Sequence, residues 1–210
     1  MARENQEVAP PRYVTVEKFP TAALSMFFTE PERVCVEDGI STYCDDDGPL
    51  FGPFSFWAYG FDFGVPTDAV ITRLTLSVKA GPRAPFTAPR FQPELGTYVD
   101  GDDFVGVVAG AFSPTPMSDL LIWYNFGDAI ADWGWAITPA ILADPVNQFS
   151  VAVSVSPVGS AQRKILFDAV KVSITYDTGY RTPRDGPHKK PTPRDPRPRP
   201  HTRPKLPRYE

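Results

Sequence analysis

Apolar side chains recur at every second position of residues 149–155, with serine or alanine between them. A period of two is that of a β-strand, because successive side chains of a strand point to opposite faces of its sheet. We therefore predict a strand here with one buried face and one face toward water. The same alternation predicts further strands at residues 70–78 and 165–176.

The alternation in residues 165–176 changes phase once. Ile165 and Phe167 occupy one phase, whereas the apolar residues from Val170 onward occupy the other. The switch at Asp168–Ala169 predicts a β-bulge or a bend at that point. Turn-forming residues at 157–162 predict that this strand and the preceding one form a hairpin.

The rest of the body also has the pattern of strands. Residues 54–63 carry aromatic side chains at alternate positions and predict a central core strand, and the proline-rich residues 81–101 predict a long loop. Many short strands separated by Pro and Gly loops favour an all-β fold, an antiparallel β-sandwich. Further strands, about eight in all, are expected at residues 13–19, 104–112 and 120–124.

One short helix is predicted among these strands. Thr138 can cap its N-terminus, Pro139 suits the first helical position, and Pro145 prevents extension past Asp144. The helix should therefore have one or two turns.

The strand pattern ends at Asp177, and an extended arm rich in proline and arginine follows at residues 179–210. The arm holds 9 prolines, 10 Lys or Arg and 3 acids, with almost no apolar side chain to bury, so it cannot fold alone. In the polyproline II conformation its 32 residues span on the order of 100 Å. We divide the chain into an N-terminal extension (1–12), a β-sandwich domain (13–178) and this arm.

The charges of the arm and the body are opposite. The whole chain has a net charge of −4, and outside the arm 11 basic residues face 22 acidic ones. The arm could lie on the acidic surface of a neighbouring copy or partner, touch nucleic acid, or be a solvated tail without a partner. We prefer the first, because nucleic-acid arms seldom carry this much proline and the arm's aromatic residues are only Tyr180 and Tyr209. Its predicted partner-binding residues are Arg181, Arg184, Lys189, Lys190, Arg194, Arg197, Arg199, Arg203, Lys205 and Arg208.

Cys35 and Cys44 flank the turn signal Asp38–Gly39. A two-residue turn would place Cys35 opposite Thr42, so a disulfide would require a longer loop or a shifted register. We expect free thiols, and two cysteines without neighbouring histidines make a poor metal site.

Catalytic groups are scarce in the body. Both histidines, His188 and His201, lie in the arm, so the body has no imidazole for a nucleophile or a zinc site. No phosphate-binding loop or dinucleotide motif is present, and no pair of carboxylates is singled out for glycoside hydrolysis. We predict that the protein is not an enzyme.

Two ligand classes remain open. Asp45, Asp46 and Asp47 could supply oxygen ligands to calcium, although such a run is more typical of a solvated loop, and no cofactor is predicted. Trp57 and Trp123 could stack on sugars, whereas Trp133 and Trp135 are expected to pack in the core.

No basic segment followed by an apolar run is found near residue 1, and no apolar run approaches the roughly 20 residues of a membrane helix. We expect a soluble protein without a secretion signal and without a membrane partner.

Four segments in this order, residues 36–43, 59–80, 132–155 and 167–177, resemble a module of tailed-bacteriophage virion proteins. The resemblance spans about residues 21–178. It depends on three patterns that are similar to those of the module. The first has aromatic residues at Tyr59, Phe61 and Phe63, followed by Pro66, Ala69 and Ile71 at the start of a long strand. The second has Trp133–Gly134 followed by Thr138–Pro139, and the third has Asp168, Val170, Val172 and Ile174 in the closing strand.

The resemblance implies a jelly-roll-like sandwich and a place on a virion assembled in the host cytoplasm, and it carries over no catalytic residues. It favours a non-enzymatic minor tail protein, with other virion proteins and copies of itself as partners. A capsid decoration protein is the alternative, since the 81–101 loop and the arm depart from the simplest modules. A carbohydrate-binding receptor module, with a host-surface glycan as ligand, is the alternative from a different class.

Overall fold

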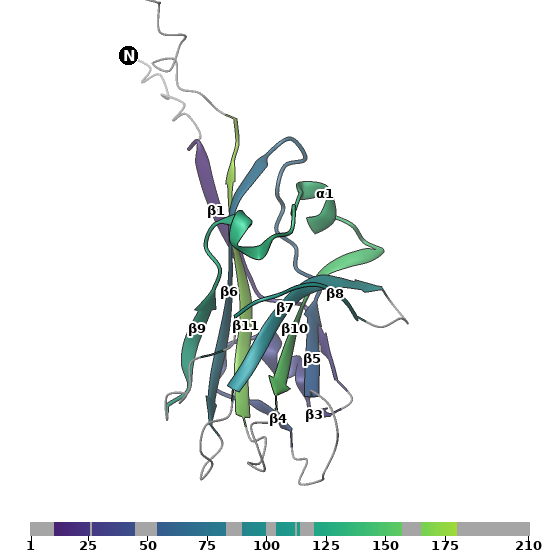
Figure 1. The fold of residues 1–210 in the computed structure, drawn as a ribbon, viewed down its shortest axis with the longest axis vertical. Coiled ribbons are helices and arrows are strands. Elements are labelled where there is room, and N and C mark those ends of the chain that lie inside the picture. The colour runs from purple at the N-terminus through teal and green to yellow at the C-terminus, as the bar shows by residue number, and fades with distance from the viewer. Residues whose placement is uncertain are drawn as a thin grey trace, which may run out of the picture. The chain divides into compact units, whose positions relative to one another are not determined.

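The computed structural model describes residues 11–25, 27–44, 54–82, 90–99, 104–111, 113, 120–156 and 165–179. The chain divides into one unit at Met1–Tyr180 and another at Arg181–Glu210, and the second unit lies wholly outside the described residues. All strand pairs within the described residues are antiparallel (Figure 1).

Eleven strands of the described residues form two sheets. The first sheet has the order β3 (Phe28–Thr29), β4 (Thr42–Cys44), β11 (Ile165–Asp177), β6 (Val70–Pro82) and β9 (Ile122–Phe126), with β1 (Tyr13–Lys18) also paired to β11. The second has the order β2 (Ala22–Leu24), β5 (Phe54–Tyr59), β10 (Asn147–Ser156), β7 (Arg90–Val99) and β8 (Phe104–Ala109).

The strand order is that of a jelly roll. When β4 to β11 are counted from one to eight, the first sheet reads 1-8-3-6 and the second reads 2-7-4-5. Two sheets of four strands wound in this way are two Greek keys folded over one core. The predicted all-β, jelly-roll-like sandwich is confirmed.

The core lies between the two sheets and is built from the alternating apolar positions of their strands. Its centre is a cluster of phenylalanine rings around Phe167, which is fully buried. The rings of Phe56, Phe91 and Phe28 meet it edge to face, with centroids 5.2, 5.3 and 5.8 Å away. Edge-to-face contacts of this kind stabilise a core beyond the area that they bury.

The predicted bulge at Asp168 is confirmed. Phe167 pairs with Ala80 and Ala169 with Lys79, so Asp168 has no partner residue in β6. Its side chain is fully buried: Oδ1 accepts from the N–H of Gly39 at 2.9 Å, and Oδ2 lies 2.7 Å from Nζ of Lys79. The bulge thus holds a carboxylate where it ties the 38–40 turn to β6.

Lys79 has a second acidic neighbour, since its Nζ donates to Oε1 of Glu37 at 2.8 Å. The hydrogen bonds to Asp168 and then to Glu37 raise the pKa of Lys79, and the bond from Lys79 lowers the pKa of Glu37. Lys79 and Glu37 thus each favour the charged state of the other.

The described residues contain one α-helix, α1 (Pro139–Leu142), where it was predicted. Oγ1 of Thr138 accepts from the N–H of Ile141 at 3.4 Å, and Pro139 begins the helix. Two 3₁₀ helices, η1 (Pro31–Cys35) and η2 (Ile130–Trp133), were not predicted.

The structure corrects two predicted strand boundaries. The strand predicted at 54–63 ends at Tyr59, because Gly60 has a positive φ of 77°. The loop predicted at 81–101 is largely strand, since β6 continues to Pro82 and β7 begins at Arg90. Pro93 is tolerated in β7 because it lies just beyond the residues that pair with β8, so its missing N–H falls where that ladder ends.

The hairpin predicted from residues 149–155 and 165–176 is wrong. The turn signal at Asp38–Gly39 does not join two paired strands either, because Cys35 lies in η1 and β4 pairs with β3 and β11. Strands β10 and β11 lie in different sheets. In the second sheet β10 lies between β5 and β7. In the first sheet β11 has β6 on one side and β1 and β4 on the other. The predicted turn at 157–162 lies outside the described residues.

The outward face of β10 is buried as well, against the expectation of a face toward water. Ser150, Ala152 and Ser154 are 0, 2 and 8 % exposed. The cause is the central position of β10: the rings of Tyr59 and Tyr98, from the two flanking strands, stack at 4.3 Å between centroids. Small side chains on β10 leave room for these larger neighbours.

Candidate functional site

The two ends of the sandwich domain lie side by side. Tyr13, at the start of β1, pairs with Asp177 at the end of β11 (Figure 1). Nε of Arg12 donates to Oδ2 of Asp177 at 3.1 Å, and the N–H of Thr178 donates to the carbonyl of Arg12 at 2.9 Å. Residues 1–10 and 180–210 are therefore both attached to the same end of the domain.

The predicted arm-binding residues, from Arg181 to Arg208, lie outside the described residues, as do Asp45, Asp46 and Asp47 of the calcium candidate. Within the described part of the chain, no group of three or more His, Cys, Asp and Glu side chains could hold a metal ion. In that same part, no helix has the length and apolar character needed to span a membrane.

Cys35 is a free thiol, as predicted, and the side chain of Cys44 lies outside the described residues. Burial, and then the charge of Glu32, raise the pKa of the Cys35 thiol to about 11. The thiolate is the reactive form of cysteine, so Cys35 is unreactive near neutral pH.

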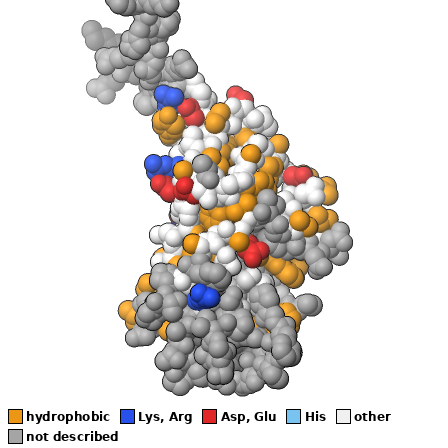
Figure 2. All heavy atoms as spheres, viewed as in Figure 1, with side chains coloured by type: hydrophobic (Ala, Val, Ile, Leu, Met, Phe, Trp, Pro, Cys, Tyr) orange, Lys and Arg blue, Asp and Glu red, His pale blue; other side chains and the backbone are white. Residues whose placement is uncertain are grey.

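A groove opens between the edge strands of the two sheets. Among the described strands, β9 is the last of the first sheet and β8 the last of the second. The space between them, which we call the β8–β9 groove, has a volume of about 770 Å³. It is lined by Ala109, Gly110, Ala111, Trp123, Tyr124, Asn125, Phe126, Gly127, Asp132 and Trp133. Hydrophobic side chains gather over the middle of the molecular face drawn in Figure 2.

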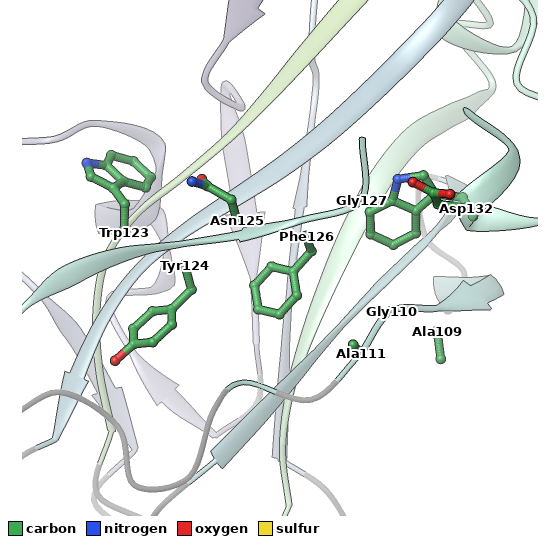
Figure 3. A pocket seen from close by; sticks show the side chains of 10 residues that line it. Ala109, Gly110, Ala111, Trp123, Tyr124, Asn125, Phe126, Gly127 and Asp132 are labelled. Atoms are coloured by element: carbon green, nitrogen blue, oxygen red, sulfur yellow. The ribbon is translucent and has the colours of Figure 1, made fainter. Parts of the chain in front are cut away.

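Aromatic rings form the floor of the groove. Tyr124 and Phe126 point from β9 toward Gly110 and Ala111, whereas Trp123 points to the other side of the strand (Figure 3). Both inward rings are 8 % exposed. Only the outer edges of these two large rings are therefore accessible from the groove.

Trp133 closes one end of this floor. Its Nε1 donates to the carbonyl of Leu74 at 3.0 Å, and its side chain is 3 % exposed, so the predicted packing role is confirmed. A Cβ at Gly127 would lie 2.2 Å from Nε1 of Trp133, and one at Gly110 would lie 3.2 Å from its Cζ3. The two glycines allow the backbone to approach the indole ring closely.

Asp132 brings a negative charge to the groove. Its Oδ2 accepts from the N–H groups of Asp128 at 3.2 Å and Ala129 at 3.0 Å. These bonds hold an exposed carboxylate beside the aromatic floor (Figure 3). Apolar rings next to a fixed acid are the chemistry of a site for an apolar ligand that carries a positive charge.

The two tryptophans predicted to stack on sugars lie on different sheets. Trp57 is partly exposed on the outward face of β5, beside Leu24 of β2, which is 40 % exposed. Nζ of Lys171 lies 4.5 Å from the ring centroid of Trp123, and it is held there by Oε1 of Glu17 at 3.0 Å. One face of Trp123 is thus occupied, and the two rings cannot act on one ligand.

Sequence reasoning did not identify the groove. Trp133 was expected to pack in the core, and no sequence pattern singled out Tyr124, Phe126 or Asp132. The only local signals were Gly110 and Gly127, whose close approach to Trp133 is visible only once β8 and β9 are placed.

The fold and these surfaces define an all-β sandwich protein. No protein-family model matches the chain, and no curated protein matches it. One similar solved structure is the K1 cleaved adhesin domain of Lys-gingipain from Porphyromonas gingivalis W83, with a TM-score of 0.30 and 10% sequence identity over 78% of this chain and 96% of that one.

Proposed function

We propose that this chain is a non-enzymatic structural protein of a tailed-bacteriophage virion, a minor tail protein whose basic, proline-rich arm docks on neighbouring subunits. The four sequence segments that resemble the virion module support this proposal. So does the jelly-roll order of the strands, which is the fold that the resemblance implied.

The pairing of β1 with β11 is the observation that carries the proposal. It attaches residues 1–10 and 180–210 to one end of the sandwich through the contacts among Arg12, Asp177 and Thr178. A folded domain with two further stretches of chain joined to one end can contact several neighbours at once. Linked contacts raise the overall affinity by a factor of roughly 10² to 10⁴ over a single contact.

The charge distribution supports docking on protein. The arm carries 10 basic residues against 3 acids, whereas the rest of the chain carries 22 acids. Attraction between exposed charges is screened by salt, so docking through the arm should weaken as ionic strength rises.

Removal of residues 180–210 tests the proposal. The deletion retains Gly179, whose N–H donates to Oδ1 of Asp177 at 2.8 Å, and every buried core residue of the described part, so the domain should fold as before. We expect its occupancy in purified particles to fall roughly a hundredfold. Quantitative mass spectrometry of particles from a complemented deletion phage measures this occupancy.

The full-length chain, supplied in the same way, is the matched control for that experiment. Normal occupancy of the truncated chain would contradict the proposed role of the arm. The copy number of the full-length chain also separates the two virion positions, because a decoration protein would be present in hundreds of copies per particle and a minor tail protein in few.

A second candidate function is sugar binding by the outward face of the second sheet. The observation that favours it is the partly exposed indole of Trp57 beside Leu24, which offers an apolar surface for a sugar ring. Trp57→Ala should abolish saturable binding on a glycan array. Trp123→Ala should leave that binding unchanged, because Lys171 already covers one face of its ring. An array without any saturable signal from the wild-type protein would eliminate this candidate.

A further inference from the structure

We propose that the β8–β9 groove is the docking site for the proline-arginine run at residues 193–200 of a second copy of the chain. The inference rests on the proposed function in one respect, that the arm docks on neighbouring subunits. It adds the site on the body and the residues of the arm that contact it.

The floor of the groove suits a polyproline II segment. Proline-rich segments in this conformation dock in grooves lined by aromatic side chains, and Tyr124, Phe126 and Trp133 supply such a lining. The volume of about 770 Å³ lies in the range of sites that hold compact ligands. A proline-rich segment also loses little conformational freedom when it binds.

The spacing within the run selects one of its faces. Polyproline II has three residues per turn and a rise of about 3.1 Å per residue, so every third residue lies on the same face. Pro193, Pro196 and Arg199 therefore share a face. Two prolines on that face can contact the aromatic floor, and the arginine lies about 9 Å beyond the second proline.

The arginine on this face complements the one acid that lines the groove in the described structure. The carboxylate of Asp132 is exposed and held by two backbone N–H groups. Arginine donates forked hydrogen bonds to carboxylates, which are stronger than bonds between neutral groups. We therefore assign Arg199 to Asp132 and the two prolines to the rings of Tyr124 and Phe126.

The arm is long enough for this contact. Fourteen residue steps separate Gly179 from Pro193, and in polyproline II they span on the order of 40 Å. The arm of one copy can thus reach a groove on a copy packed beside it.

A peptide titration tests the site directly. The probe is a fluorescent synthetic peptide of residues 190–203, and the protein is the chain truncated after Gly179, which retains every buried residue of the described core. We expect saturable binding by fluorescence polarisation in the micromolar range. Absence of saturation at millimolar protein would overturn the inference.

Variants of the peptide test the predicted face. Arg199→Ala should weaken binding about tenfold, because it removes a charge-assisted hydrogen bond. Pro193→Ala with Pro196→Ala should weaken it similarly, whereas Pro198→Ala, on another face, is the matched control and should bind as the wild-type peptide does. A loss for the Pro198→Ala peptide as large as that for the double variant would contradict the assigned face.

Variants of the protein test the groove. Ala111 is exposed and lies within the groove, so Ala111→Arg should block the peptide. Val146→Arg places the same side chain at a residue that is 62 % exposed and outside the lining, so it should leave binding unchanged. Asp132→Asn should weaken the wild-type peptide but cause no further loss with the Arg199→Ala peptide. Equal binding to Ala111→Arg and Val146→Arg would place the peptide elsewhere.

Sedimentation of the full-length protein tests whether the groove is filled by a second copy. We expect concentration-dependent association that Ala111→Arg abolishes. A full-length protein that stays monomeric and binds the peptide only after its own arm is removed would show docking within one chain and would overturn the assignment to a second copy.

The two proposals can fail separately. If arm deletion lowers particle occupancy but the peptide does not bind, the virion role stands and the groove assignment fails. If the peptide binds and Ala111→Arg blocks it while the truncated chain enters particles normally, the groove stands and the virion role of the arm fails.

Discussion

Phe167→Ala is expected to lower the free energy of unfolding by about 4 kcal/mol. The Phe167 side chain is fully buried and meets the rings of Phe28, Phe56 and Phe91 edge to face. Truncation removes the apolar surface of one ring and leaves a cavity among three others that are held by both sheets. Urea unfolding of the purified protein, with an unchanged dependence on denaturant, measures the effect.

Phe27→Ala is the matched control for this prediction. Phe27 is 41 % exposed and makes an edge-to-face contact with Phe54 at 4.7 Å between centroids, so its truncation should cost about 1 kcal/mol. If both substitutions have the same small effect, the cluster around Phe167 is not the centre of the core.

Asp168→Asn is expected to lower the free energy of unfolding by about 3 kcal/mol. The carboxylate is fully buried and lies 2.7 Å from Nζ of Lys79, whose side chain is 19 % exposed. Loss of the negative charge leaves the partly buried ammonium group with Glu37 as its remaining acidic partner. The value is at the lower end of the range for a broken buried pair because Glu37 remains.

Glu37→Gln is the control, since it removes the exposed partner of the same lysine and should have a much smaller effect. The pKa of Glu37 is lowered by the bond from Lys79, so its contribution is present above the unfolded value of roughly 4.3 and is lost as the pH falls through the folded value. The pKa of Lys79 is raised, so its contribution is lost only as the pH rises above roughly 10.4 through the folded value. A Glu37→Gln effect as large as that of Asp168→Asn would contradict this division of roles.

Periodicity was sufficient to predict the long strands of the fold. Phe149 to Val155 and Leu74 to Val78 alternate because their inward side chains fill one core. Val70 does not follow this phase: it is 63 % exposed, because the β6–β11 register shifts between Thr175 and Tyr176. The phase change at Asp168 was readable for the same reason, since one unpaired residue moves every later side chain to the other face. The helix at Pro139 was readable because a threonine cap and two prolines determine it locally.

Strands whose existence depends on their pairing partners could not be predicted from the sequence. β7 contains Pro93 within a proline-rich stretch, and only its place beside the end of β8 makes that residue acceptable. β2, β3 and β4 have two or three residues each, too few to show a period. The buried outward face of β10 results from the ring stack of Tyr59 and Tyr98 on its neighbours, which the alternation within β10 does not encode.

The candidate site was less predictable than the fold. A groove between β8 and β9 exists because both are last in their sheets, which is a property of topology and not of either strand's residues. Its lining joins residues from three separate parts of the chain around Ala109, Tyr124 and Asp132. The basic, proline-rich composition of the arm, in contrast, was evident from the sequence.

The pairing of Tyr13 with Asp177 determines how the domain responds to mechanical load. Tension that drew residues 11 and 179 apart would act on the same end of the paired strands β1 and β11. It would break the hydrogen bonds between them one after another. A partner that gripped both segments together would leave that ladder unstressed and transmit force to the sandwich as a whole.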